Sequence, residues 1–164
     1  SDAQIAVLLE GSELAVYLCG GARDYQTLTS WFFAHNLQDL QHTIELQARG
    51  LTVRMIATNE GFDGVVREAN GREHTFSTRV PRGPSAGLYH VMDDGCRTGA
   101  IVSEDIAPSD VAGFRGTWCS ASGVREQVTP ILPLLRDGDA LRVRIGNSSE
   151  GRLLRVLPLH LPLH

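Results

Sequence analysis

The residues that could perform covalent chemistry lie in settings that favour a structural role. His90, within the apolar run Leu88–Met92, is the histidine expected to face a cleft, where it would act as a general acid or base. Cys119 follows Trp118, and a cysteine beside a histidine can become a nucleophile. A cysteine inside an apolar β-prone run is more often buried and inert. The chain also lacks a G-x-S-x-G nucleophile elbow, so the sequence favours a protein without a catalytic site.

Metal and cofactor sites are not indicated either. His160 and His164 are four residues apart, but Pro162 lies between them and prevents a helix. An extended chain separates such a pair by about 13 Å, which is too far for one ion. The sequence has no glycine-rich phosphate loop and no lysine, which excludes a P-loop and Schiff-base chemistry. We therefore expect no metal and no cofactor.

The charge balance argues against a nucleic-acid partner. The chain has 15 basic residues, all of them arginine, against 19 acidic residues, and its net charge is -4. Proteins that bind nucleic acids usually carry a basic surplus that displaces counterions. No apolar run approaches the ~20 residues of a membrane-spanning helix. We therefore expect neither a nucleic acid nor a membrane as partner.

A set of aromatic and basic side chains is typical of recognition surfaces. Tyrosine and tryptophan supply large, rigid contact areas, and arginine holds a carboxylate through two parallel hydrogen bonds. Tyr89 and Trp118 are expected to form pockets, and Arg79 or Arg115 to bind peptide carboxylates. The candidate peptide-binding residues are Tyr25, Trp31, Arg79, Tyr89, His90, Arg115 and Trp118.

The cysteines Cys19, Cys96 and Cys119 leave two redox states open. Their odd number and the lack of a C-x-x-C pair differ from a disulfide framework or a zinc site. The favoured interpretation is buried, reduced thiols in a cytoplasmic protein. The alternative is one disulfide and one free thiol in an exported protein. The sequence does not open with the charged segment and apolar run of a secretory signal, so an exported protein would be present here in its mature form.

Short strands separated by turn residues must position these side chains. Gln4–Glu10 and Glu13–Cys19 flank the hairpin signal Gly11-Ser12. Alternating apolar and polar residues then predict a meander of four strands, with its strongest turn signal at Asn70-Gly71. The strands of the meander are predicted at Leu40–Arg49, Leu51–Thr58, Phe62–Ala69 and Arg72–Val80.

The second half of the chain repeats this organisation after the loop Pro81–Gly87. About 10 to 11 short strands at this spacing predict an all-β, antiparallel barrel- or sandwich-like fold. The length predicts one domain over residues 1–164. The later strands are predicted at Leu88–Met92, Arg97–Glu104, Gly113–Ser120, Arg125–Leu132, Ala140–Ile145 and Arg152–Leu157.

One segment between the first strands departs from the strand pattern. Tyr25, Leu28, Trp31 and Phe32 are spaced three, three and one apart, which is a helical stripe. Asp24 is a suitable N-cap. We therefore expect one short helix near residues 24–36, covering an open end of the sheet.

The end of the chain departs from the pattern in a different way. Residues 157–160, Leu-Pro-Leu-His, repeat at once as residues 161–164. Proline at every fourth position excludes a helix and removes hydrogen-bond donors. Residues 146–164 are therefore expected to form an extended tail that docks on the domain or on a neighbour.

The order of these segments resembles a known group of proteins. The segments Ile5–Gly11, Leu14–Gly20, Phe62–Val66 and Ser85–Tyr89, with the strand of Phe76 and the segment of Trp31, carry the resemblance. They resemble small β-rich domains of high-GC bacteria, and the accessory proteins of ribosomal-peptide natural-product pathways of the crocagin type. The resemblance implies a protein without catalytic motifs that holds a precursor peptide.

The sequence thus predicts a non-catalytic, peptide-binding accessory protein. An extended peptide would add to an exposed strand through main-chain hydrogen bonds, beside an aromatic and arginine-lined groove. One alternative is a small hydrolase or cyclase that uses His90 or Cys119. Another is a structural or sensing β-domain of an exported protein. We also expect a homodimer, formed through sheet edges or an exchanged C-terminal tail.

Overall fold

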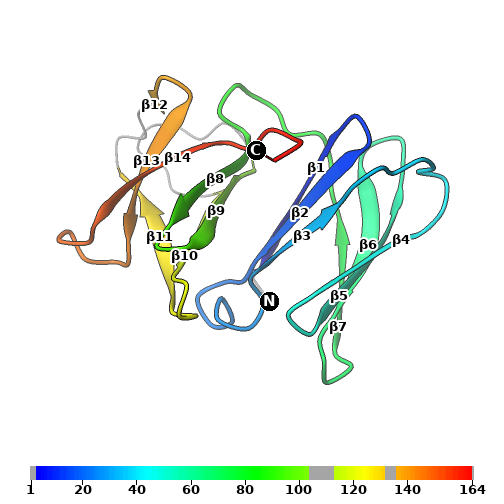
Figure 1. Ribbon diagram of the computed structural model, residues 1–164, viewed down its shortest axis with the longest axis horizontal. Helices are drawn as coiled ribbons and strands as arrows, with labels where there is room; N and C mark the ends of the chain where they lie inside the picture. The colour runs from blue at the N-terminus through cyan, green and yellow to red at the C-terminus, as the bar shows by residue number, and fades with distance from the viewer. Residues whose placement is uncertain (1–2, 104–112, 132–135, 164) are drawn as a thin grey trace. The chain divides into compact units, whose positions relative to one another are not determined.

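The computed structural model describes residues 3–103, 113–131 and 136–163, and the regular secondary structure within these ranges is entirely β-strand (Figure 1). The predicted all-β fold is therefore confirmed. The same described residues contain no helix that is long and apolar enough to cross a membrane. The chain divides into two compact units. We call them the barrel unit (Ser1–Gln4, Cys19–Thr29 and Pro81–Leu159) and the sheet unit (Ile5–Leu18, Ser30–Val80 and His160–His164).

The single domain predicted over residues 1–164 stays a prediction, because two compact units can belong to one domain. The boundary between the units cuts strands β1 (Gln4–Glu10) and β2 (Glu13–Cys19) near their ends instead of following a linker. Composition reveals a domain boundary only where an exposed, polar or flexible linker separates two folded parts. The short segment Cys19–Thr29 belongs with the second half of the chain, and no local pattern announces that.

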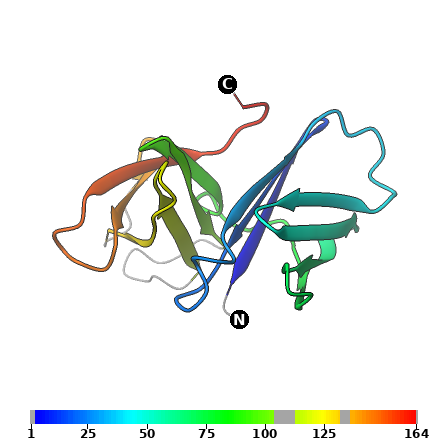
Figure 2. The ribbon, with the colours of Figure 1, turned by 60° about the horizontal axis from the view of Figure 1, so that its bottom comes forward.

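Six antiparallel strands of the barrel unit close into a barrel. Each pairs with its neighbour along the chain, and the last strand returns to the first, with Leu157 opposite His90 and Pro158 opposite Tyr89. Figures 1 and 2 show these closing strands side by side. Closure leaves none of the six with an open edge. They are β8 (Gly87–Asp93), β9 (Cys96–Val102), β10 (Phe114–Cys119), β11 (Arg125–Pro130), β13 (Ala140–Ile145) and β14 (Leu153–Pro158), and the two-residue strand β12 (Arg136–Asp137) pairs with β13.

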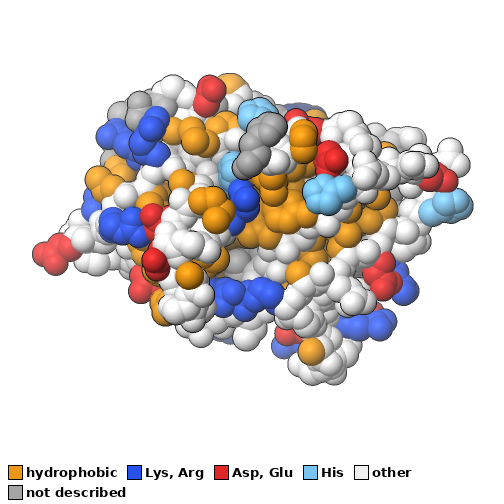
Figure 3. All heavy atoms as spheres, viewed as in Figure 1, with side chains coloured by type: hydrophobic (Ala, Val, Ile, Leu, Met, Phe, Trp, Pro, Cys, Tyr) orange, Lys and Arg blue, Asp and Glu red, His pale blue; other side chains and the backbone are white. Residues whose placement is uncertain are grey.

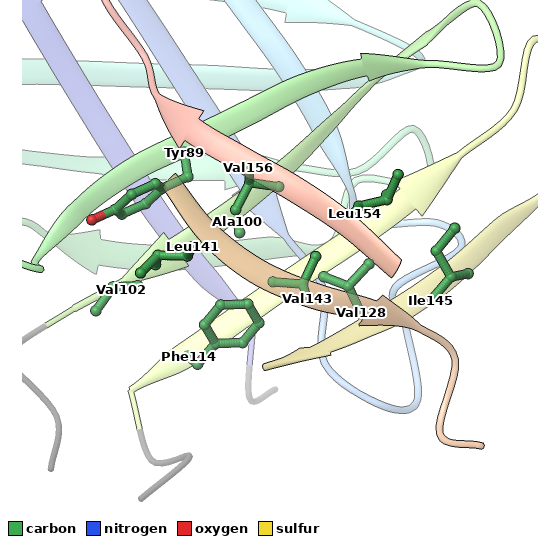
Figure 4. Packing of buried hydrophobic residues seen from close by; sticks show 10 residues of the cluster. All are labelled: Tyr89, Ala100, Val102, Phe114, Val128, Leu141, Val143, Ile145, Leu154 and Val156. Atoms are coloured by element: carbon green, nitrogen blue, oxygen red, sulfur yellow. The ribbon is translucent and has the colours of Figure 1, made fainter. Parts of the chain in front are cut away.

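The barrel closes around apolar side chains that alternate along its strands (Figure 4). Gly116 faces this core between neighbouring strands. A Cβ atom at Gly116 would lie 2.5 Å from Cγ2 of Val128 and 2.9 Å from the carbonyl oxygen of Gly99. Only glycine lets the strands approach this closely. The core residues are Tyr89, Ala100, Val102, Phe114, Val128, Leu141, Val143, Ile145, Leu154 and Val156.

Part of the predicted extended tail belongs to the barrel, while residues 146–151 form bends and turns. Leu153–Pro158 is the closing strand β14. The next residue, Leu159, is 3% exposed, and its N–H donates to the carbonyl oxygen of Leu88 at 2.9 Å. His160 then lies in the sheet unit, with Nδ1 3.6 Å from Oε1 of Glu10. The tail is therefore extended at Leu153–Pro158, where it completes the barrel, whereas residues 161–162 of its proline-rich end form a bend.

The sheet unit contains a three-stranded sheet and the four-stranded meander. The three-stranded sheet has the order β1-β2-β3 and the meander the order β4-β5-β6-β7, so the meander is confirmed. In β5, Leu51, Val53 and Met55 are buried while Arg54 is exposed, which is the predicted period of two. The remaining strands of the unit are β3 (Ser30–Ala34), β4 (Ile44–Ala48), β5 (Leu51–Ala57), β6 (Phe62–Arg67) and β7 (Glu73–Ser77).

The short helix predicted near residues 24–36 is wrong. Residues 22–27 form turns, and residues 30–34 are strand β3. Trp31 lies opposite Tyr17 of β2, with the two ring centroids 4.4 Å apart. Aromatic residues pack well across antiparallel strands. This pairing with a distant part of the chain overrides the local helical spacing.

The cysteines differ from the favoured expectation of reduced thiols. Cys96 and Cys119 form a disulfide with a Cα–Cα distance of 5.7 Å, and it links the start of β9 to the end of β10. Cys19 is a buried free cysteine, and its Sγ lies 3.3 Å from Oγ1 of Thr117. The alternative of one disulfide and one free thiol is the one that the structure adopts.

The disulfide should stabilise the barrel unit measurably. Replacing both Cys96 and Cys119 by serine should lower the free energy of unfolding by about 3 kcal/mol, because the bond closes a loop with a sequence separation of 23. Urea denaturation followed by circular dichroism measures this change. Dithiothreitol should destabilise the native protein by a similar amount and leave the double variant unaffected. A native protein that is insensitive to dithiothreitol, with three alkylatable thiols, would contradict the assignment.

Candidate functional site

The residues predicted to bind a peptide are distributed over both units. Trp31 and Arg79 belong to the sheet unit. The other predicted residues belong to the barrel unit, where they have separate surroundings. The members in the barrel unit are Tyr25, Tyr89, His90, Arg115 and Trp118.

The two aromatic residues expected to form pockets, Tyr89 and Trp118, both pack in or against the barrel core. Tyr89 is 2% exposed, belongs to the core, and its hydroxyl donates to the carbonyl oxygen of Ser85 at 2.8 Å. Trp118 packs against the same core, and its Nε1–H donates to Oδ2 of Asp93 at 2.8 Å. A buried indole or phenol usually needs such a partner. Peptide pockets at Tyr89 and Trp118 stay a prediction; in this structure Tyr89 lies in the core and Trp118 is half-buried against it.

The carboxylate of Asp93, at the end of β8, connects the indole of Trp118 to the guanidinium of Arg152. Its carboxylate also accepts from Arg152, with Nη1 3.1 Å from Oδ1 and Nη2 2.5 Å from Oδ2. The side chain of Asp93 is 20% exposed. Hydrogen bonds from Arg152, and then from Trp118, hold the pKa of Asp93 below its ordinary value. The network stabilises the ionised carboxylate in the folded barrel.

The proposed catalytic pair of His90 and Cys119 is not supported by its surroundings. Nη1 of Arg97 lies 2.5 Å from Nδ1 of His90, and a guanidinium only donates, so this ring nitrogen accepts. Burial lowers the pKa of Arg97. Cys119 carries no thiol in this structure because it is in the disulfide. Neither Nδ1 of His90 nor the sulfur of Cys119 is then free for acid–base or nucleophilic work.

The remaining aromatic candidates are local features of their own segments. Tyr25 lies in the turns before β3, where its N–H donates to the carbonyl oxygen of Gly21 at 2.9 Å. Trp31 is stacked on Phe33, with ring centroids 5.6 Å apart, besides its contact with Tyr17. Ring packing within the three-stranded sheet therefore accounts for the aromatic side chain of Trp31, while the contact of Tyr25 with Gly21 is made by its backbone.

Strand β7 has one hydrogen-bonded side and one open side. Among the described strands it pairs only with β6. The N–H of Thr78 donates to the carbonyl oxygen of Phe62 at 2.7 Å, and the N–H of Glu68 donates to that of Arg72 at 2.8 Å. Hydrogen-bonded pairs alternate along an antiparallel ladder. The even-numbered residues of β7 therefore direct their backbone groups toward β6.

The odd-numbered residues of β7 direct their backbone groups the other way. Their N–H and C=O groups point toward the side that carries no described strand. Their side chains are exposed, whereas those of His74 and Phe76 are half-buried. A row of backbone N–H and C=O groups at the edge of a sheet is a template for pairing with another strand. We call the backbone of Glu73, Thr75 and Ser77 the open edge.

A polar groove lies at the end of this edge. Its volume is about 420 Å³. The predicted residue Arg79 lines it, but its Nε lies 3.6 Å from Oε2 of Glu60. With Asp63 the groove holds two carboxylates and one guanidinium, which suits a basic side chain better than the carboxylate expected at Arg79. We call it the edge groove, lined by Thr58, Asn59, Glu60, Asp63, Ser77, Thr78 and Arg79.

Arg115 lines a different groove, on the barrel unit. This groove has a volume of about 370 Å³ and lies along β10 and β11. Arg115 is the only residue of the predicted set among those that line it. We call it the barrel groove, lined by Gln4, Gly113, Phe114, Arg115, Gly116, Gln127, Val128, Thr129, Pro130 and Asn147.

Sequence reasoning missed several polar residues that matter in these places. Asp93 was recognisable as a turn residue, but its partner Arg152 lies 59 residues away. Asp63 and Glu60 lie in a strand and a turn that carry no chemical motif. Gln4 opens the first strand without any distinguishing neighbour. Only long-range pairing brings these residues to their sites, so no local signal could have found them.

Neither the surface nor comparison with other proteins assigns the chain to a known class. Basic and acidic side chains are interspersed on the face shown in Figure 3. Within the described ranges, no group of three or more His, Cys, Asp or Glu residues could hold a metal ion. Comparison of the chain with family models, curated proteins and solved structures gives no match. We therefore infer function from the geometry of this chain alone.

The Asp93 network should make the barrel sensitive to acid. Because its folded-state pKa is lowered, Asp93 contributes stability above its ordinary value of 3.8, and loses it as the pH falls through the lowered pKa. Asp93→Asn should lower the melting temperature at pH 7 and flatten its decline below about pH 4. Thermal melts between about pH 2 and 7 measure this dependence.

The neighbouring Asp94 provides the control. It is exposed in the same turn, so Asp94→Asn should leave both the melting temperature and its acid dependence close to those of the native protein. Equal acid slopes for Asp93→Asn and the native protein would contradict the role assigned to this carboxylate.

Proposed function

We propose that the protein binds an extended peptide, without chemically altering it, by adding the peptide as a further strand to β7. The observation that carries this proposal is the open edge of Glu73, Thr75 and Ser77. Each of these residues offers one N–H and one C=O group to a guest strand. Because the barrel is closed, none of its six strands has an open edge at which backbone groups could pair with a guest strand.

Backbone pairing alone supports only weak binding. A hydrogen bond contributes about 0.5–1.5 kcal/mol net, while association costs about 4–15 kcal/mol in lost freedom. The open edge is three residues of β7 long, so its hydrogen bonds roughly balance that cost. Side-chain contacts must therefore add affinity and selectivity.

The edge groove supplies a basis for selectivity. Glu60 and Asp63 give it a negative balance against Arg79, and all three residues are exposed. At the other end of the edge, Glu73 is already held by Arg67, with Nη2 2.8 Å from Oε1. The preferred guest is a β-prone segment with a lysine or arginine that reaches the edge groove.

The resemblance drawn from the sequence supports one source for such a guest. Accessory proteins of ribosomal-peptide pathways hold a precursor peptide, and an extended precursor segment has the required form. A second copy of this chain could pair with the same edge, so a homodimer through β7 would compete with the peptide. In this proposal β7 accepts one strand at a time.

The disulfide bears on the compartment and on the alternative of an exported β-domain. Disulfides persist in oxidising compartments and are rare in the cytoplasm. The Cys96–Cys119 bond therefore favours an exported protein over the cytoplasmic location expected from the sequence. A peptide-binding edge is compatible with either location. Non-reducing mass spectrometry of the protein from its native source tests this point.

Blocking the open edge should weaken peptide binding. Thr75→Pro removes an N–H group that points away from β6, so the sheet is retained while the guest strand loses a donor. The probe is an acetylated and amidated decapeptide of alternating threonine and valine that ends in one arginine. Isothermal titration should show binding to the native protein and at least about tenfold weaker binding to Thr75→Pro.

The matched control is Thr75→Val, which keeps the N–H group and the β-branched shape. It should bind the probe as the native protein does. Circular dichroism checks that both variants are folded. Equal binding by Thr75→Pro and Thr75→Val, or no binding of the probe by the native protein, would contradict strand addition at β7.

The edge groove should select for the basic residue. Asp63→Asn removes one of its two carboxylates and should weaken binding of the arginine probe by about two- to fivefold, the usual size of an exposed charge contact. A probe with glutamate in place of the arginine should bind the native protein more weakly. Asp39→Asn, an exposed change outside the groove, is the control. A glutamate probe that binds as well as the arginine probe would contradict this selectivity.

A further inference from the structure

One row of paired residues carries the apolar face of the meander out to β7. Met55 of β5 lies opposite Gly64 of β6, and Gly64 lies opposite Phe76 of β7. Directly paired residues of neighbouring strands share a face of the sheet. Met55 is 1% exposed, whereas Phe76 is half-buried. The burial of this row is therefore complete inside the sheet and incomplete at its edge.

Gly64 makes room for the ring of Phe76. A Cβ atom at Gly64 would lie 2.7 Å from Cζ of Phe76 and 2.8 Å from Cβ of Met55. The ring therefore lies over the backbone of β6, as an aromatic side chain does when it covers a glycine of the neighbouring strand. Strand β6 covers part of the ring, and no described strand covers it from the other side of β7.

The next row of the same face ends in a polar contact. Val66 lies opposite His74, and Nε2 of His74 lies 2.8 Å from Oε2 of Glu68. Nε of Arg72 lies 4.0 Å from the same oxygen. Glu68 thus has two partners already, so this end of the face does not call for a charged group on a guest. Phe76 is the apolar side chain that β7 leaves for a guest to cover.

The edge groove takes its Asp63 carboxylate from the opposite, polar face of the meander. Asp63 lies opposite Ser77, and both side chains are exposed and line the groove. Asp63 directly precedes Gly64, and Ser77 directly follows Phe76. Successive side chains of a strand point to opposite faces. A guest arginine that contacts Asp63 therefore points to the polar face, away from Phe76.

We propose that the guest strand is amphipathic, with apolar side chains on the face opposite its arginine. This inference deepens the proposed function and rests on it. A paired strand would lie about 4.7–4.9 Å from β7, close enough for its side chains to cover the exposed part of Phe76. When the arginine occupies the edge groove, the residues one and three positions away from it point to the apolar face. Phe76 and Asp63 together then select the phase of the guest sequence.

Two capped nonapeptides of identical composition test this selection. The in-phase peptide, acetyl-TVTVTVTVR-amide, carries valine next to its arginine, and the out-of-phase peptide, acetyl-VTVTVTVTR-amide, carries threonine there. Valine and threonine are both β-branched, so the peptides differ in which face is apolar and not in strand propensity. Isothermal titration should show the in-phase peptide binding the native protein about fivefold more tightly. This comparison varies only the ligand, so it stands even if a variant fails to fold.

Variants assign the preference to Phe76. Phe76→Thr keeps a β-branched residue in β7 and removes the ring, so it should weaken binding of the in-phase peptide to the level of the out-of-phase peptide. The matched control is Leu46→Thr, which removes a half-buried apolar side chain from the same face at β4. It should preserve the fivefold preference. Circular dichroism checks that both variants are folded.

The outcomes separate this inference from strand addition itself. Equal affinities for the native protein, with both peptides weakened by Thr75→Pro, would overturn the amphipathic selection and leave strand addition at β7 in place. A preference that survives Phe76→Thr, or that favours the out-of-phase peptide, would overturn the selection as well. If neither peptide binds the native protein, the proposed function fails and the inference fails with it.

Discussion

Every backbone N–H and C=O group of a strand needs a hydrogen-bond partner, and this requirement governs both units of the protein. In the barrel unit, the last strand β14 pairs with the first strand β8, so backbone groups of each strand find hydrogen-bond partners in the other. In the sheet unit, the meander ends at β7, and the groups of Glu73, Thr75 and Ser77 are left to solvent or to a guest. The functional account depends on that difference between a closed and an open sheet.

The residues with the most chemical character are largely used to build the fold. Tyr89 and Trp118 fill and cap the barrel, Asp93 joins Trp118 to Arg152, and Cys119 is tied to Cys96. The groups left for recognition at the open edge and the edge groove are less conspicuous: backbone amides and exposed carboxylates. Backbone amides can pair with a guest strand, and exposed carboxylates can contact a basic side chain.

The sequence predicts strands well because period-two alternation is local. Gln4–Glu10, Glu13–Cys19 and Ala140–Ile145 are found with the predicted bounds. The same reasoning fails at Trp31, whose spacing resembles a helix until Tyr17 pairs with it. It also could not distinguish a closed barrel from an open sheet, because closure depends on Leu157 meeting His90 across the whole unit. The grooves share that limit: Gln4 and Arg115 line one groove only after the barrel has formed.

Hydrogen exchange of individual β7 amides tests the central claim most directly. In the free protein the amides of Glu73, Thr75 and Ser77 should exchange rapidly, while those of His74 and Phe76 are protected by β6. Saturation with the capped arginine decapeptide should slow the three odd-numbered amides and leave the even-numbered ones unchanged. Odd-numbered amides that are already protected in the free protein, or that stay unprotected in the complex, would contradict an open edge that receives a guest strand.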